Sequence, residues 1–139
     1  MEIIPVDDHI VAIDHNLLGL PGVGVTYVVR ADSVALIETG TALTVPHTLA
    51  GLEAMGVRPE QVEHILCTHI HMDHAGGAGY LAEALPRAAV YINSAVAEHL
   101  ADPTRLMASV RRAVGEQAWP LHGDMRPVAP ERLRPAEAL

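Results

Sequence analysis

Residues 68–77 read THIHMDHAGG and place three histidines and one aspartate within six positions. In an extended segment, residues i and i+2 point to the same side, so His69, His71 and Asp73 can converge on one point. His74 follows where the chain is predicted to turn into a helix. Imidazole and carboxylate are usual ligands of Zn²⁺, Fe²⁺ and Mn²⁺, and this spacing therefore predicts a metal site.

The ligand segment lies between a predicted strand and a predicted helix. The apolar run VEHILCT at 62–68 is typical of a buried strand, and AGGAGYLAEAL at 75–85 indicates a helix that Pro86 stops. Open α/β sheets hold their ligands at the carboxyl ends of strands, and the small residues at 75–77 allow the helix to start close to a metal. The alternative, an accidental cluster of solvated or buried histidines, does not explain this placement.

The rest of the sequence alternates strand-like and helix-like segments. Thr44 is the predicted N-cap of one helix, which ends at Gly56. A polar turn at 31–33 joins two apolar runs into a predicted hairpin. The predicted strands are 9–15, 25–30, 34–37, 62–68 and 88–92, and the predicted helices are 44–55, 75–85, 94–100 and 102–115. This order predicts an α/β domain with helices packed on a sheet.

A length of 139 residues fits one compact domain. We expect an α/β core over 1–115, followed by a proline-rich tail over 116–139 that runs extended along the surface. The tail contains His122 and Asp124, which offer a further pair of potential ligands. Because they lie in an irregular segment with no predicted strand before them, they are a weak candidate for a metal site.

Composition excludes several classes of partner. The formal net charge of −8 disfavours nucleic acid, because an acidic chain repels phosphate groups. The single cysteine, Cys67, rules out a disulfide within the chain. The N-terminus does not resemble a signal peptide, and no run reaches the roughly 18 apolar residues of a membrane span. We therefore expect a soluble, cytoplasmic protein with no membrane partner.

Two segments of the chain resemble the metallo-β-lactamase superfamily. HIHMDHAGG at 69–77 resembles the HxHxDH signature of that superfamily, and VTYVVRADSVALIETG at 25–40 is similar to its N-terminal hairpin, which usually ends in Asp-Thr-Gly. The resemblance extends over about residues 9–115. It implies an αββα sandwich of two similar halves, of which this chain supplies about one half, as a mixed sheet with flanking helices.

The resemblance also implies roles for individual residues. His69 and His71 would bind one metal, and Asp73 and His74 a second, with Zn²⁺ expected and Fe²⁺ or Mn²⁺ as alternatives. A metal-bound hydroxide, which Asp73 would orient as the catalytic carboxylate, would attack an ester, lactone, thioester, amide or phosphoester of a small molecule. Glu38 stands where the superfamily usually has Asp, and it would support the metal-binding histidines; its alternative role is a solvated carboxylate at a strand end.

Three functions remain open from the sequence. The first is this metal-dependent hydrolase, and the second is a mononuclear iron oxygenase of the same fold. The third is a non-catalytic metal-binding half-domain or interaction module, because the other half of the superfamily fold normally supplies further ligands. Half of a sandwich exposes an apolar sheet face, so we expect either self-association or a missing C-terminal half as the partner.

Overall fold

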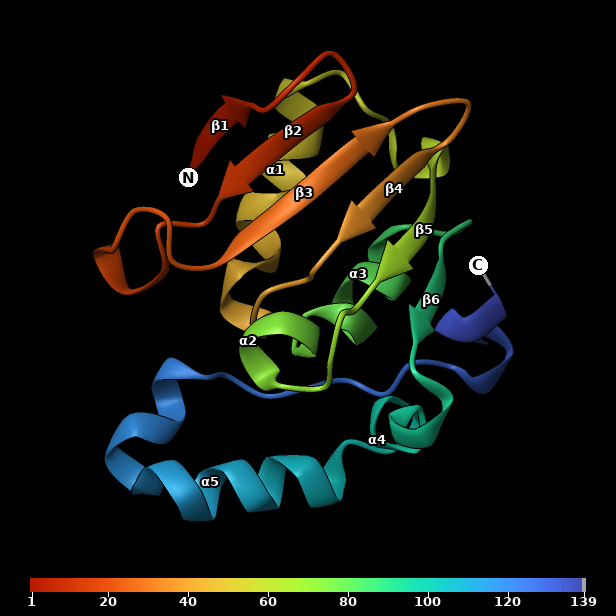
Figure 1. The fold of residues 1–139 in the computed structure, drawn as a ribbon. Helices are drawn as coiled ribbons and strands as arrows, with labels where there is room; N and C mark the ends of the chain where they lie inside the picture. Colours follow the sequence, from red (N-terminus) through yellow and green to blue (C-terminus); the bar gives the residue numbers. More distant parts are fainter. Residues whose placement is uncertain (139) are drawn as a thin grey trace.

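Within residues 1–138, which the computed structural model describes, seven strands form one mixed sheet in the order β1-β2-β3-β4-β5-β6-β7 (Figure 1). Strands β1 to β4 are antiparallel to one another, and β4 to β7 run parallel. The strands are β1 (Glu2–Pro5), β2 (Ile10–Asp14), β3 (Val25–Arg30), β4 (Val34–Ile37), β5 (Val62–Leu66), β6 (Ala89–Ile92) and β7 (Leu133–Pro135).

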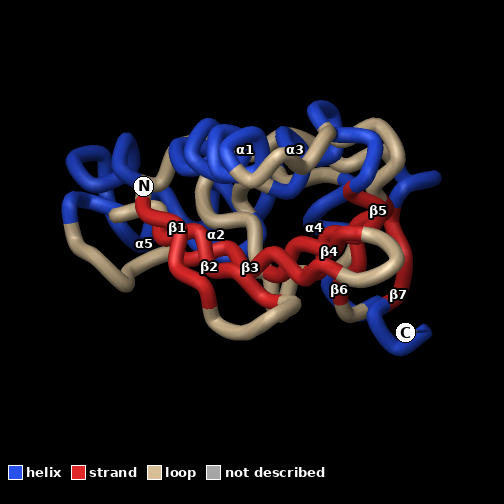
Figure 2. Tube along the Cα trace, turned by 90° about the horizontal axis from the view of Figure 1, so that it is seen from above, coloured by secondary structure: helices blue, strands red, loops and turns tan. Residues whose placement is uncertain are grey.

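Helices pack on one face of this sheet and along one of its ends. Figure 2 shows α1 and α3 on the same side of the strands, whereas α5 lies beyond the edge of the sheet where α2 is found (Figure 1). The helices are α1 (Val45–Ala54), α2 (Met72–Ala75), α3 (Ala78–Ala84), α4 (Glu98–Ala101) and α5 (Thr104–Ala118). No helix within residues 1–138 is both long enough and apolar enough to cross a bilayer.

The core lies between the sheet and helices α1 and α3. Neighbouring strands contribute fully buried aliphatic residues that are partners in the strand register, namely Val28, Leu36, Ile65 and Val90. A side chain at Gly51 of α1 would place its Cβ 2.6 Å from Cδ1 of Ile13, so α1 approaches β2 as closely as glycine permits. This aliphatic core agrees with a sequence that contains no phenylalanine.

The predicted α/β class is confirmed. The sequence analysis did not predict the two outermost strands, β1 and β7. β1 pairs antiparallel with β2, and β7 pairs parallel with β6 from within the segment that we predicted to be an extended tail. The sequence LRP of β7 contains no apolar run, and the Ile3-Ile4 pair of β1 is too short to predict a strand by itself. Pro135 is compatible with β7 because a proline, which donates no hydrogen bond, is tolerated in an edge strand.

The two predicted helix boundaries at Thr44 and Gly115 have different outcomes. Thr44 was predicted to cap α1 through its hydroxyl, but that hydroxyl donates to the carbonyl of Thr41 at 3.0 Å instead. The regular part of α5 breaks at Gly115, as predicted, because Gly115 has a φ of 79° and a ψ of 167°, and a further helical segment follows it across a kink to Ala118.

Candidate metal centre

The candidate site forms where the parallel strands β4 and β5 end side by side. Glu38 follows β4 directly, and its backbone N–H donates to the carbonyl of Leu66, the last residue of β5, at 2.8 Å. The HxHxDH segment begins three residues after Leu66. Both segments therefore reach the same edge of the sheet, which is the position that the sequence predicted for the site.

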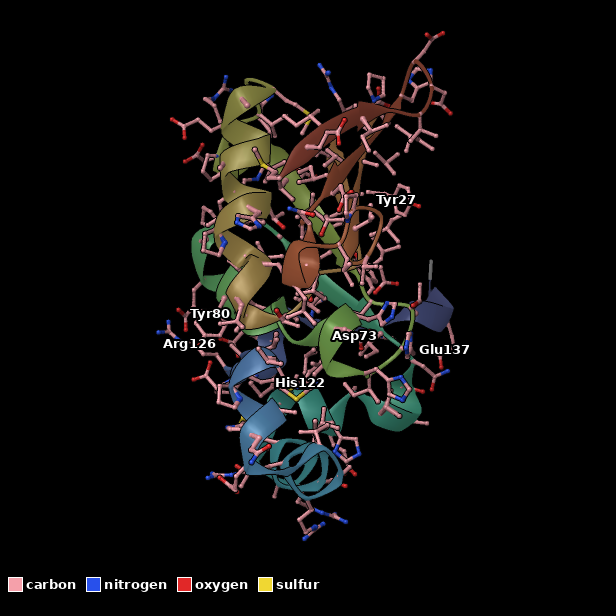
Figure 3. The ribbon with its side chains drawn as sticks, turned by 90° about the vertical axis from the view of Figure 1, so that its left-hand side faces the viewer. Tyr27, Asp73, Tyr80, His122, Arg126 and Glu137 are labelled. Carbon is pink, nitrogen blue, oxygen red and sulfur yellow. The ribbon has the colours of Figure 1, made fainter. Side chains whose placement is uncertain are left out.

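The structure brings the four predicted ligand residues together. The ring centroid of His69 lies 4.7 Å from that of His71 and 4.1 Å from that of His74. The carboxylate Oδ2 of Asp73, which is exposed on α2 (Figure 3), lies 3.4 Å from Nε2 of His74. Within residues 1–138, however, no three His, Cys, Asp or Glu side chains are arranged as a closed metal-binding group. The donor set suits a metal, and its role as ligand set stays a prediction.

Asp73 and His74 are positioned by the helical turn α2 and not by the alternation of side chains along an extended strand. β5 ends at Leu66 and α2 begins at Met72, so the predicted alternation does not extend to Asp73. Met72 is 3% exposed and Ala75 is fully buried, so both face the core from one side of the turn. Burying that apolar side leaves Asp73 exposed and His74 half-buried, which is the physical reason for the difference.

Glu38 binds both ends of the ligand segment. Its Oε1 accepts a hydrogen bond from the backbone N–H of Thr68 at 3.2 Å, and its Oε2 lies 3.1 Å from Nδ1 of His74. A carboxylate only accepts, so Nδ1 of His74 must donate, which leaves Nε2 as the ring nitrogen that a metal could bind. The longer Glu side chain therefore reaches a histidine N–H, as the sequence suggested for this departure from Asp.

The backbone at Glu38 is strained. Its φ is 69°, in the left-handed region that residues with a side chain rarely adopt, at a cost on the order of 1–3 kcal/mol. Such strain persists only where surrounding contacts hold it. Here those contacts are the bond to Leu66 and the two bonds of a carboxylate on a residue that is only 8% exposed.

Thr39 is a supporting residue that the sequence analysis missed. Its backbone N–H and its hydroxyl both donate to the carbonyl of His74 at 2.8 Å. A Cβ added at Gly77 would lie 2.6 Å from the carbonyl oxygen of Thr39. Glycine at position 77 thus allows the backbone after His74 to pack against the backbone at Thr39. This close contact is a better reason for a small residue there than proximity to a metal. The signal available in the sequence was a hydroxyl residue directly after Glu38.

A buried histidine lies beneath this turn. Nε2 of His15 contacts the hydroxyls of Thr48 at 3.0 Å and Thr26 at 3.1 Å, and Thr26 also donates to the carbonyl of Glu38. Burial lowers the pKa of His15 to about 4, and the nearby His47 contributes to the same shift. His15 therefore stays neutral and supports the strand end from inside; its spacing in the sequence carried no sign of this.

An open cavity of about 260 Å³ adjoins the site. Its lining combines residues of the β2–β3 loop and the first half of β3, including Val23 and Tyr27, with Glu38, Asp73 and His74. His122 and Asp124 do not line it: Nδ1 of His122 contacts the carbonyl of Ala118, and Asp124 accepts from Tyr80. In Figure 3, Tyr80, the partner of Asp124, lies on the side of α1 and away from Asp73. This position does not strengthen the weak case for His122 and Asp124 as ligands.

Comparisons with known proteins agree with this architecture. The profile of the metallo-beta-lactamase superfamily matches residues 19–135. The fold is similar to that of Rm3 metallo-beta-lactamase, with 26% identity, a TM-score of 0.62, and coverage of 73% of this chain and 35% of that one. It is also similar to MEM-A1, a subclass B3 metallo-beta-lactamase from a soil metagenome library, with 22% identity, a TM-score of 0.72, and coverage of 97% and 46%.

A third similar structure is native FEZ-1 metallo-beta-lactamase from Legionella gormanii, with 11% identity, a TM-score of 0.73, and coverage of 97% of this chain and 47% of that one. No curated protein matches the chain. The chain spans less than half the length of these three structures. Since the superfamily profile matches most of the sequence and the fold agrees, the chain belongs to the metallo-β-lactamase superfamily.

Proposed function

We propose that this chain carries about half of the active site of a metal-dependent hydrolase. One observation carries the proposal: the rings of His69, His71 and His74 lie together, with Asp73 beside Nε2 of His74 and Glu38 at its Nδ1. Metal-binding histidines usually donate the N–H of one ring nitrogen to a carboxylate and bind the metal through the other nitrogen. In His74, Nδ1 contacts Glu38 and Nε2 faces Asp73.

The metal that fits this donor set best is Zn²⁺, because imidazole and carboxylate are its preferred nitrogen and oxygen ligands. His69, His71, Asp73 and His74 would hold one or two ions. A bound divalent cation would supply Lewis acidity toward a carbonyl or phosphoryl oxygen and would acidify a water molecule. If two ions share these four residues, each has two ligands from this chain and keeps coordination positions for groups from elsewhere, which agrees with the chain's coverage of less than half of the similar structures.

The side chains of this chain would divide the remaining work. Glu38 keeps the proton of His74 on Nδ1, and Thr39 holds the backbone of His74 in place through two hydrogen bonds. Asp73 is an exposed carboxylate that lines the cavity, so it can accept a proton from an attacking water. The residues of the β2–β3 loop and of β3 that line the cavity would bind the non-reacting part of a substrate and exclude water.

The substrate class is a small molecule with an ester, lactone, thioester, amide or phosphoester bond. The similar structures are named metallo-beta-lactamases, which makes a cyclic amide one candidate among these. The acidic net charge of the chain is unfavourable for a nucleic acid substrate.

Metal binding gives the direct test. Elemental analysis and a zinc titration should show zinc bound to the wild-type chain and at least a tenfold weaker affinity in the variants His69→Ala, His71→Ala and Asp73→Asn. The matched control is His9→Ala, which removes an exposed histidine far along the chain from the site. Equal zinc binding by all of these variants would contradict the proposal, and iron in place of zinc would favour an oxygenase.

A further inference from the structure

Helices α4 and α5 line an open cavity of about 380 Å³, which shares no residue with the cavity beside the candidate metal centre. Figure 1 shows α4 next to the first turns of α5, below the edge of the sheet. Since only helical residues line this cavity, it is not part of the sheet face to which Tyr27 points (Figure 3). We call it the α4–α5 cavity, and its lining residues are His99, Arg105, Leu106, Ala108, Ser109 and Arg112.

The polar groups of the α4–α5 cavity can all donate hydrogen bonds. Arg105, Ser109 and Arg112 occupy positions i, i+4 and i+7 of α5 and therefore lie on one face of it. The histidine of α4 adds a half-buried imidazole. Within residues 1–138 no carboxylate lines the cavity, and the flanking acids Glu98 and Asp102 lie outside its lining. The chain has 17 acidic and nine basic residues, so a lining with two guanidinium groups and no acid is a distinct local feature.

The two arginines of this cavity contribute nothing evident to the stability of α5. Arg111, their neighbour on the same helix, donates to both carboxylate oxygens of Glu116, at 2.8 and 2.6 Å. Arg105 and Arg112 form no ion pair with any residue in the described part of the chain. Arg105 also lies in the first turn of α5, where the positive end of the helix dipole disfavours a cation. Both guanidinium groups are therefore available to an anion from outside the chain.

We propose that the α4–α5 cavity binds a small organic phosphate of the monoester type. A phosphate monoester carries a charge of about −1.5 to −2 at neutral pH and three acceptor oxygens, which match two guanidinium groups and a hydroxyl. The cavity volume falls in the range of roughly 300–1,000 Å³ that is typical of small-molecule pockets. Leu106 and Ala108 would contact the organic group of the ligand. This proposal does not depend on the candidate metal centre or on the proposed hydrolase function.

A lipid headgroup would offer the same phosphate chemistry, but the packing of α5 disfavours that source. A helix that lies on a membrane inserts its apolar side chains into the lipid. In α5, Leu106, Met107 and Val110 pack against the core of the domain instead. These side chains are not available for insertion, so the structure favours a soluble ligand.

Calorimetric titration with phenyl phosphate tests the site. The chain is first freed of metal and chelator by dialysis, because a bound metal ion would also attract phosphate. Phenyl phosphate should bind saturably at one site, and Arg105→Gln and Arg112→Gln should each weaken its affinity at least tenfold. Arg111→Gln is the matched control, because Arg111 is exposed on the same helix but does not line the cavity, and it should leave the affinity nearly unchanged. Glutamine and arginine have similar helix propensities, so all three variants should keep α5 intact.

Three results would overturn the proposal. The first is the absence of saturable binding at millimolar phenyl phosphate and low ionic strength. The second is an equal loss of affinity in Arg111→Gln, which would show a diffuse attraction to the basic residues of α5 instead of a site. The third is binding to vesicles that contain phosphatidic acid without binding to phenyl phosphate, which would identify a membrane as the source of the phosphate.

Discussion

The Glu38→Gln substitution keeps the shape of a side chain that binds both ends of the ligand segment, but it exchanges one oxygen for an NH₂ group. In the wild-type chain, both oxygens accept hydrogen bonds, one from the backbone of Thr68 and one from Nδ1 of His74. The glutamine oxygen can still accept from Thr68, but its NH₂ group would then face Nδ1 as a donor. The proton of His74 should therefore move to Nε2, the nitrogen that a metal requires.

Glu38→Gln should have two separate effects, one on the stability of the chain and one on its affinity for zinc. Replacing a charged hydrogen bond by a neutral one should lower the free energy of unfolding by about 1 kcal/mol. Blocking Nε2 of His74 should weaken zinc binding by roughly 10–100-fold, the usual effect of removing the partner of a metal-binding histidine, which is about 1.4–2.8 kcal/mol.

Two assays measure these effects. A zinc titration against a competing chelator gives the affinity, and nitrogen NMR of the metal-free chain identifies the protonated nitrogen of His74. Glu98→Gln, at an exposed carboxylate of α4, is the matched control. In a His74→Ala background, Glu38→Gln should have no further effect on zinc affinity, because it acts through that ring. A Glu38→Gln chain that binds zinc as wild type does, with the proton still on Nδ1, would refute this reasoning.

Two further predictions concern the support beneath the site. The free energy of unfolding should fall by about 3 kcal/mol as the pH drops from about 6.5 to about 4, because His15 takes up a proton in the unfolded chain but stays neutral when folded. Denaturant titrations at several pH values would measure this, and an unchanged pH dependence in His15→Gln would count against it. Gly77→Ala should cost about 1–3 kcal/mol, since the new Cβ would lie 2.6 Å from the carbonyl oxygen of Thr39. Wild-type stability of that variant would show that the two backbones do not make this contact.

The sequence by itself was sufficient to predict the central strands, the α/β class and the four ligand-type residues at a sheet edge. These features depend on local patterns. The run at 62–66 predicts a strand from its own β-branched and apolar residues, and the spacing of His69 and His71 is a property of a few neighbouring residues. Glu38 could also be named as a supporting residue, because it follows a predicted strand directly.

Only the tertiary structure decided how these parts meet. Glu38 and His74 are separated by 36 positions, and their contact exists because β4 and β5 lie parallel and end together. The burial of Met72 determined that a helical turn would hold Asp73. The pairing of the edge strands β1 and β7 depends on register across the whole sheet. Hydrogen bonds and packing between distant segments set these features, and no local pattern of residues encodes them.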